Sequence, residues 1–143
     1  MTSFPIRQAE TDGEIARLFP VIRELRPHLK DGDDLVARVR RQERQGYRLI
    51  YVEDAGAPVS CAGFRFAEHL FAERALYVDD LICVESHRGK GFAEALMRWM
   101  ETHAREQGCE TFHLDSGTQR LRAHHFYFRL GLSITSFHFV KKL

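Results

Sequence analysis

The most informative stretch of the chain is residues 84–99, which read Val-Glu-Ser-His-Arg-Gly-Lys-Gly-Phe-Ala-Glu-Ala-Leu-Met-Arg-Trp. It follows an apolar, strand-like run, Leu81–Val84, and passes through a basic turn into a helical pattern. The first amides of a helix lack intrahelical partners and carry a partial positive charge. Glycines leave such amides open, and basic side chains add positive charge, so the turn predicts a binding site for a phosphate or pyrophosphate. The residues concerned are Arg88, Gly89, Lys90 and Gly91.

Two common phosphate-binding motifs do not fit this turn. A P-loop needs Ser or Thr after Lys90, and a dinucleotide fingerprint needs a third glycine after Gly91. The turn instead has the pattern Arg-x-x-Gly-x-Ala at Arg88, Gly91 and Ala93. This pattern resembles the acetyl-CoA pyrophosphate loop of the GCN5-related N-acetyltransferases (GNAT). Taken alone, the turn is equally consistent with a basic loop that only joins a strand to a helix.

Composition places the chain among globular proteins. It has 143 residues, 44% hydrophobic and 29% charged, and a net charge of +1. This length suits one domain, so we expect a single domain over residues 1–143. The near-neutral charge argues against nucleic acid or an anionic membrane as a partner. The first residues lack the form of a signal peptide, and no apolar run approaches a membrane span. The three cysteines are odd in number and far apart, which predicts reduced thiols in a cytoplasmic protein.

The order of elements predicts a mixed α/β fold. Strands are expected at Pro5–Ala9, Arg48–Glu53, Val59–Phe66, Leu76–Val84, Thr111–Leu114 and Leu132–Val140. In the last of these, Ile134 and Phe139 are expected in the core. Helices are expected from Thr11 or Asp12 to Pro27, from Asp31–Asp34 to Arg44, and over Phe92–Gln107 and Arg120–Leu130. The strand–helix–strand order over residues 76–114 implies parallel pairing of its two strands.

Two further segments resemble the same family. Ala123–Leu132, with Phe126-Tyr127 and Gly131, resembles its closing motif, and Leu76–Cys83 resembles its fourth strand. Three motifs in the right order extend the resemblance over about Pro5 to Lys141. The resemblance implies a GNAT-type twisted mixed sheet of about six to seven strands with flanking helices. In it, parallel fourth and fifth strands splay apart around a crossover helix.

The resemblance also implies where acetyl-CoA binds. The pantetheine arm would pair with the backbone of Leu81, Ile82 and Cys83, because unpaired strand amides favour a ligand with peptide-like groups. The pyrophosphate would bind the backbone amides of Arg88, Gly89, Lys90, Gly91, Phe92 and Ala93. The family often has an Asn after the fifth strand. That place is taken here by Thr118, which is the candidate for this polar contact to the pantetheine arm.

The reaction that the resemblance implies is attack of an amine on a thioester. Tyr127 is the candidate general acid for the leaving thiolate, and the alternative is a tyrosine of an aromatic core. Asp79 and Asp80 are candidates for the base that takes the amine proton. Successive residues of a strand alternate faces, so one of the two would reach the site, and a β-bulge would change which one. Proton removal through ordered water, with no dedicated base, is an equal alternative.

These observations predict an acetyl-CoA-dependent N-acetyltransferase that acts on a primary amine of a small molecule or a protein. One alternative is a catalytically silent acyl-CoA-binding regulatory module, and another is a nucleotide- or nucleic-acid-binding domain. No His-Glu-x-x-His or Cys-x-x-Cys pattern is present, so we expect no metal. A homodimer is an open option, because an exposed last strand could pair across a two-fold axis. Which amine accepts the acetyl group is not readable from the sequence.

Overall fold

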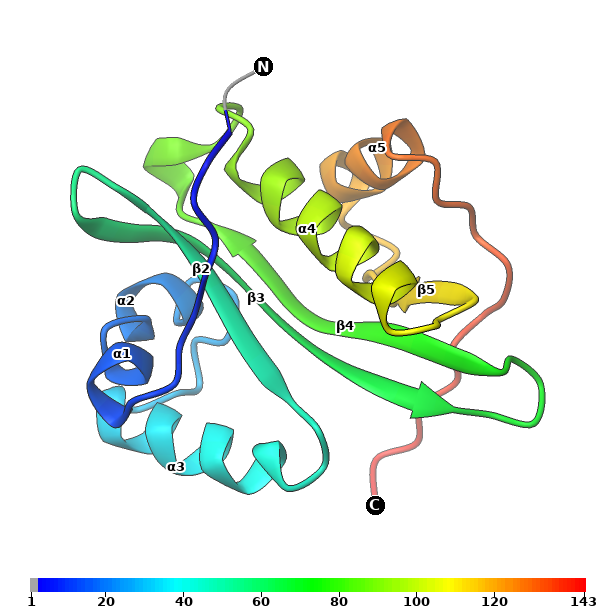
Figure 1. Ribbon diagram of the computed structural model, residues 1–143, viewed down its shortest axis with the longest axis horizontal. Coiled ribbons are helices and arrows are strands. Elements are labelled where there is room, and N and C mark those ends of the chain that lie inside the picture. The colour runs from blue at the N-terminus through cyan, green and yellow to red at the C-terminus, as the bar shows by residue number, and fades with distance from the viewer. Residues whose placement is uncertain (1–2) are drawn as a thin grey trace. The chain divides into compact units, whose positions relative to one another are not determined.

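The computed structural model describes residues 3–143 and contains the expected alternation of strands and helices (Figure 1). The elements are β1 (Arg7–Gln8), α1 (Asp12–Ala16), α2 (Phe19–Ile22), α3 (Gly32–Glu43), β2 (Arg48–Asp54), β3 (Ala57–Glu68), β4 (Arg74–Cys83), the 3₁₀ turn η1 (Glu85–His87), α4 (Phe92–Glu106), β5 (Thr111–Leu114) and α5 (Leu121–Arg129). They fall into two compact units, Met1–His113 and Leu114–Leu143.

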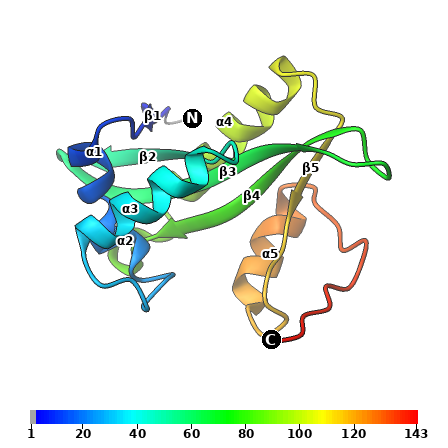
Figure 2. The same cartoon turned by 90° about the horizontal axis from the view of Figure 1, so that it is seen from below.

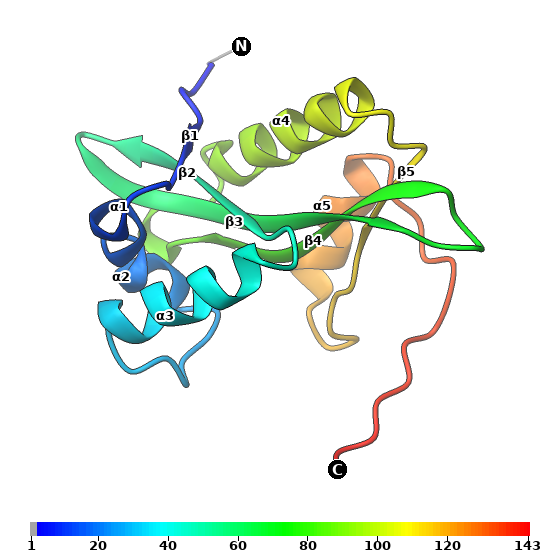
Figure 3. The same ribbon diagram turned by 60° about the horizontal axis from the view of Figure 1, so that its bottom comes forward.

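The sheet has the order β1-β2-β3-β4-β5. Strands β1 to β4 pair antiparallel, and β5 is parallel to β4, so the mixed α/β class is confirmed. In the first unit, α1–α3 cover one face of the sheet and α4 covers the other (Figures 2 and 3). The described residues form five strands, fewer than the six to seven expected.

Each face of the sheet buries its own apolar core. On the side of α1–α3, a cluster joins helix and strand residues that include Ile15, Leu35, Leu49 and Cys61. On the side of α4, the amphipathic helix buries the face that carries Leu96 and Met100. The aromatic rings of Phe64 and Trp99 meet there, with centroids 6.1 Å apart. Burial of each large apolar side chain contributes roughly 1.5–3 kcal/mol, so these two cores position the sheet and its flanking helices.

The first predicted helix is divided in two. Helix α1 ends at Ala16, and α2 begins at Phe19 with Pro20 in its first turn. Proline has no N–H to donate to the carbonyl of the residue four positions earlier, which here is Ala16. The expectation of one helix up to Pro27 was therefore wrong, although its apolar residues Ile15, Leu18 and Ile22 are buried as expected.

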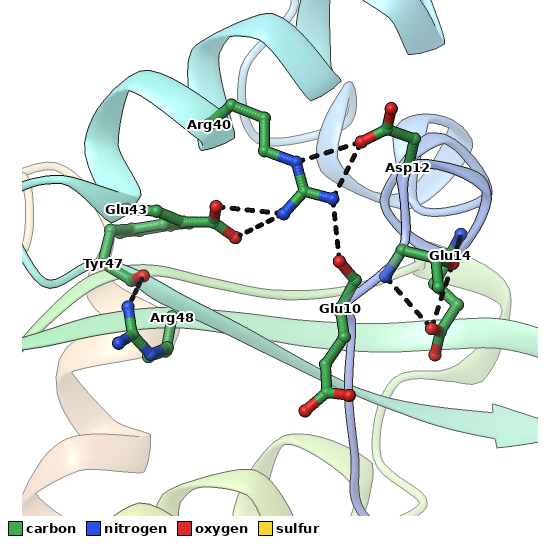
Figure 4. A network of polar contacts seen from close by, with 8 residues as sticks. Glu10, Asp12, Glu14, Arg40, Glu43, Tyr47 and Arg48 are labelled. Carbon is green, nitrogen blue, oxygen red and sulfur yellow. Dashed lines mark hydrogen bonds and ion pairs between the residues drawn. The ribbon is translucent and has the colours of Figure 1, made fainter.

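Polar contacts join α3 to the start of α1 (Figure 4). The Arg40 guanidinium donates to the Asp12 carboxylate and to the Glu10 carbonyl, both at 2.8 Å. The same side chain donates to Glu43 at 2.9 Å. At the same end of α1, Thr11 is the N-cap and forms a capping box with Glu14. The exposed ion pairs stabilise little individually, so these contacts mainly set the direction in which the chain enters α1.

The second unit lacks the strand expected at Leu132–Val140. Residues 132–143 have no regular secondary structure, and Ile134 and Phe139 are 68% and 92% exposed. Both the strand and the two core residues were therefore predicted wrongly. The apolar pattern alone cannot form a strand, because its amides and carbonyls need a neighbouring strand to bond. The homodimer remains a prediction, without the strand on which it was based.

Among the described residues, no helix is long and apolar enough to cross a membrane.

Candidate functional site

The turn between β4 and α4 contains two glycines in a left-handed conformation. Gly89 and Gly91 have φ angles of 77° and 93°, in the left-handed region that glycine adopts without strain. Gly91 is the N-cap of α4, and no side chain caps this helix end. Ala95 N–H makes the first bond of the helix, to the Gly91 carbonyl at 3.0 Å. The amides of residues 92–94 therefore precede the helical hydrogen-bond ladder and point out of the helix end.

Neighbouring groups hold this turn in place. Phe92 is 4% exposed, and its ring lies 4.4 Å from that of Phe4. Arg88 Nε donates to the Cys83 carbonyl at 3.3 Å. His87 Nε2 lies 3.2 Å from Asp54 Oδ2, at the turn between β2 and β3. Gly89, Lys90 and Gly91 are exposed, so the anchored turn presents its glycines and its lysine to solvent.

Successive residues of β4 direct their backbone N–H and C=O groups to opposite edges of the strand. Cys61 lies opposite Ile82, and the Val84 N–H donates to the Val59 carbonyl at 2.9 Å. Alternate residues of an antiparallel pair bond to the same neighbour, so Ile82 also directs its amide and carbonyl toward β3. The buried Ser60 hydroxyl adds a bond of 2.9 Å to the Ile82 carbonyl. The backbone groups of Leu81 and Cys83 consequently point to the opposite edge.

A β-bulge in β4 places two carboxylates on one face of the sheet. Gly63 lies opposite Asp80, and the next residue, Phe64, lies opposite Val78, so Asp79 is the extra residue. Without the bulge, Asp79 and Asp80 would point to opposite faces. Here both side chains contact residues on the side of α1–α3.

Each carboxylate is bound by an arginine. Asp79 accepts two bonds from Arg65, at 3.0 and 2.8 Å. Burial raises the pKa of the Asp79 carboxyl above its ordinary value, and the bonds from Arg65 oppose that shift. Asp80 accepts from Arg26 Nε at 2.9 Å and from the Tyr47 hydroxyl at 2.8 Å. The sheet therefore holds two oriented carboxylates at the residues that precede Leu81.

The remaining candidate residues, Thr118 and Tyr127, belong to the second unit. Tyr127 is half-buried on α5, and the helix is closed by Gly131, whose φ is 89°. Burial raises the pKa of the Tyr127 phenol, and the charge of Arg120 opposes the shift in part. Thr118 is exposed in the turn that precedes α5.

Sequence reasoning missed the residues that bind the two carboxylates. Arg26, Tyr47 and Arg65 lie between 14 and 54 residues from their partners in the chain, and none belongs to a recognisable motif. One available signal was Gly63, an isolated glycine in an apolar strand pattern, which suggests a bulge or a close approach. It points to a crowded position without telling which side chain fills it.

Known proteins resemble this chain in sequence and in fold. Residues 12–132 match the sequence profile of the Acetyltransferase (GNAT) family. The chain is 26% identical over 130 residues to a streptothricin acetyltransferase of Streptomyces lavendulae, which covers 91% of this chain and 63% of that protein. The chain thus spans less than two thirds of the length of that curated relative.

Solved structures share the fold at low sequence identity. A ribosomal-protein-alanine N-acetyltransferase from Brucella melitensis superposes with a TM-score of 0.81 at 19% identity, over 99% of this chain and 100% of that one. The structure of AAC(6')-Iy with a bisubstrate analogue, CoA-S-monomethyl-acetylneamine, gives a TM-score of 0.82 at 14% identity over 99% of both chains. At these identities the two structures support the fold alone.

Proposed function

Because the chain belongs to the GNAT acetyltransferase family, we propose that it is an N-acetyltransferase that moves the acetyl group of acetyl-CoA to a primary amine. The observation that carries the proposal is the turn of residues 88–93. Two left-handed glycines and an uncapped helix end present backbone amides beside two basic side chains. Such an arrangement fits the diphosphate of coenzyme A, since helix N-termini and successive amides favour anions.

In this proposal, the amides from Arg88 through Ala93 bind the pyrophosphate. The pantetheine arm lies along β4, where the backbone groups of Leu81 and Cys83 point away from β3, and where the Cys83 carbonyl also accepts from Arg88 Nε. Ile82 lies between them and directs its own groups toward β3, so we assign it a packing contact. Thr118 remains the proposed side-chain contact to the arm.

The amine nitrogen attacks the thioester carbon, the C–N bond forms, and the C–S bond then breaks. An N–H of β4 near Leu81 would stabilise the oxyanion, a contribution of about 3 kcal/mol in comparable sites. Before the attack, the ammonium form of the substrate gives its proton to a carboxylate of β4, directly or through one water, and this frees the lone pair of the nitrogen. Each oxygen of both carboxylates accepts one hydrogen bond, so this pairing does not separate them. We favour Asp80 for this role because it is adjacent in the chain to Leu81, whose backbone groups face the proposed pantetheine arm.

Tyr127 is the proposed general acid. A thiolate of pKa about 8.5 is a fair leaving group, so a proton from a phenol helps its departure by a moderate factor. The support is the match of Phe126-Tyr127 to the family motif, together with burial, which keeps the phenol protonated.

The acceptor is proposed to be a small-molecule amine. The support is the relative that covers most of this chain, whose name gives streptothricin as its substrate. A protein amine is the competing acceptor, and the location is predicted to be cytoplasmic, as the dispersed cysteines suggest.

The test has two parts. Acetyl-CoA should raise the unfolding temperature where ATP and RNA do not, since a ligand at 100 times its Kd stabilises by about 2.7 kcal/mol. A panel of amino sugars, amino acids, polyamines and peptide N-termini is then assayed for release of free thiol. Thermal stabilisation without turnover on any amine would favour the silent acyl-CoA-binding module. Absence of stabilisation by acetyl-CoA would refute the proposal.

A further inference from the structure

Tyr47 lies immediately before β2, on the side of the sheet that α1–α3 cover. Its side chain is 4% exposed, within the same apolar cluster as Leu49 and Tyr51. A buried phenol needs a partner for its hydroxyl. That partner is Asp80 Oδ2, at 2.8 Å. The bond joins residues 33 positions apart and connects the apolar core directly to a candidate catalytic carboxylate.

Gly63 makes room for this contact. It lies opposite Asp80 in the β3–β4 pairing, beside the bulge. A Cβ placed on Gly63 would overlap the hydroxyl oxygen and ring atoms of Tyr47. Its φ lies outside the left-handed region, so no backbone requirement explains this glycine. The Tyr47 phenol occupies the space that a side chain at position 63 would fill.

The second oxygen of Asp80 is bound from another direction. Arg26 Nε donates to Oδ1 at 2.9 Å, and the same guanidinium donates to the Asp79 carbonyl at 3.0 Å. With one donor on each oxygen, the carboxylate is restrained from rotating, yet each oxygen keeps a lone pair for a further proton. The Arg26 side chain is 42% exposed, whereas Tyr47 is buried.

The surroundings keep Tyr47 a proton donor. Burial, and then the charge of Asp80, raise the pKa of the phenol well above its ordinary value. Facing the pair are Arg26 from the segment after α2, Asp79 with its partner Arg65, and the buried thiol of Cys61 on β3.

We propose that Tyr47 is a positioning residue for acetyl transfer, which acts by holding the Asp80 carboxylate in the orientation that accepts the amine proton. The inference rests on the proposed function, since it assumes that Asp80 takes that proton. Tyr47 itself touches no substrate in this scheme. The proton passes from the ammonium to a free lone pair of Asp80 and then to solvent, and the phenol proton of Tyr47 stays in place throughout.

The kinetic test compares two buried tyrosines of the same segment. Tyr47→Phe removes the hydroxyl that binds Asp80, and Tyr51→Phe removes one that lies 3.4 Å from Glu14. Both rings are buried in the same cluster, so both variants lose a hydroxyl from a similar setting. We expect kcat to fall about 10- to 100-fold in Tyr47→Phe, with the KM for acetyl-CoA unchanged. Tyr51→Phe should retain the kcat of the wild type.

A second variant disturbs the Tyr47–Asp80 hydrogen bond from β3, the strand that pairs with the strand of Asp80. Gly63→Ala displaces the Tyr47 phenol by overlap, so it should lower kcat in the same way. The double variant Tyr47→Phe/Gly63→Ala should be no slower than the slower single variant, because both changes act on one contact. Urea unfolding of each variant shows that it is folded under assay conditions. A fall in the kcat of the double variant equal to the product of the two single-variant falls would contradict the proposal.

An NMR readout does not depend on turnover. With tyrosine labelled at the ring carbon that bears oxygen, Tyr47→Phe assigns the resonance among the four tyrosines. We expect that Asp80→Asn shifts this resonance and that Asp54→Asn, a carboxylate paired with His87, leaves it in place. An unmoved resonance in Asp80→Asn, or equal kcat in Tyr47→Phe and the wild type, would overturn the positioning role. Failure of the proposed function appears differently, as a wild-type chain that acetylates no amine.

Discussion

Replacement of Gly91 by alanine allows the effect of the turn before α4 on stability to be distinguished from its effect on coenzyme binding. Gly91 has a φ of 93°, and a Cβ added there would meet only Phe4 Cε2, at 3.7 Å, an ordinary contact. The cost of Gly91→Ala is therefore conformational and amounts to about 1–2 kcal/mol for a left-handed non-glycine residue. Gly46 offers a matched control, since its φ is 86° and nothing lies within 4 Å of its Cβ position. Urea unfolding should show about the same loss for both variants.

The two variants should differ in acetyl-CoA binding. If alanine relaxes out of the left-handed region, the amides of Phe92 and Ala93 turn away from the pyrophosphate. Loss of one hydrogen bond to a charged group costs about 1.5–3 kcal/mol, which weakens Kd roughly 10- to 150-fold. Isothermal titration should show this for Gly91→Ala and an unchanged Kd for Gly46→Ala. A wild-type Kd in Gly91→Ala, or equal weakening in both variants, would refute the role given to these amides.

Three further predictions concern the proposed acid and the first helix cap. Tyr127→Phe should lower kcat while leaving the Kd of acetyl-CoA nearly intact, as measured by thiol release and titration; unchanged turnover at every pH would remove Tyr127 from the mechanism. Burial raises the pKa of Tyr127, so its phenol stays protonated to a higher pH than an ordinary tyrosine, and kcat should not decline through its loss below about pH 10. A fall of kcat centred at lower pH that disappears in Tyr127→Phe would contradict this. Thr11→Ala removes the hydroxyl that accepts from the Glu14 amide at 3.1 Å and should lower the free energy of unfolding by about 1 kcal/mol without changing kcat. Equal stability of Thr11→Ala and the wild type in urea would show that the capping box contributes nothing.

Local sequence signals predicted the local structure well. The turn of residues 88–93 and the start of α4 follow from glycines, charges and helical spacing within one short segment. The bounds of α4 and β5 fall within one residue of those expected, because each is marked by periodicity and by a nearby glycine or turn. The break between α1 and α2 was also readable, since Pro20 forbids one helical bond, but the apolar spacing across it outweighed that signal.

Sequence-based predictions were wrong where the structure depends on pairing with a distant strand. The apolar residues of 132–140 have strand-like composition, yet Ile134 and Phe139 are exposed, because a strand exists only where another strand bonds to it. The orientation of the Asp79 and Asp80 side chains also depends on how the strand is paired. Alternation predicts opposite faces, and only the observed pairing with Gly63 and Phe64 shows the bulge that puts both on one face.

What the sequence by itself determined is the family, the order of elements from β2 to α5 and the glycine-containing turn, because these depend on residues that lie close together in the chain. The tertiary structure alone decided which groups bind the two carboxylates. Tyr47, Gly63 and Asp80 meet through two strand pairings and a buried core, and a hydrogen bond across 33 residues leaves no local pattern. The chemistry of the turn is thus encoded by neighbours in sequence, and the orientation of the carboxylate by neighbours in space.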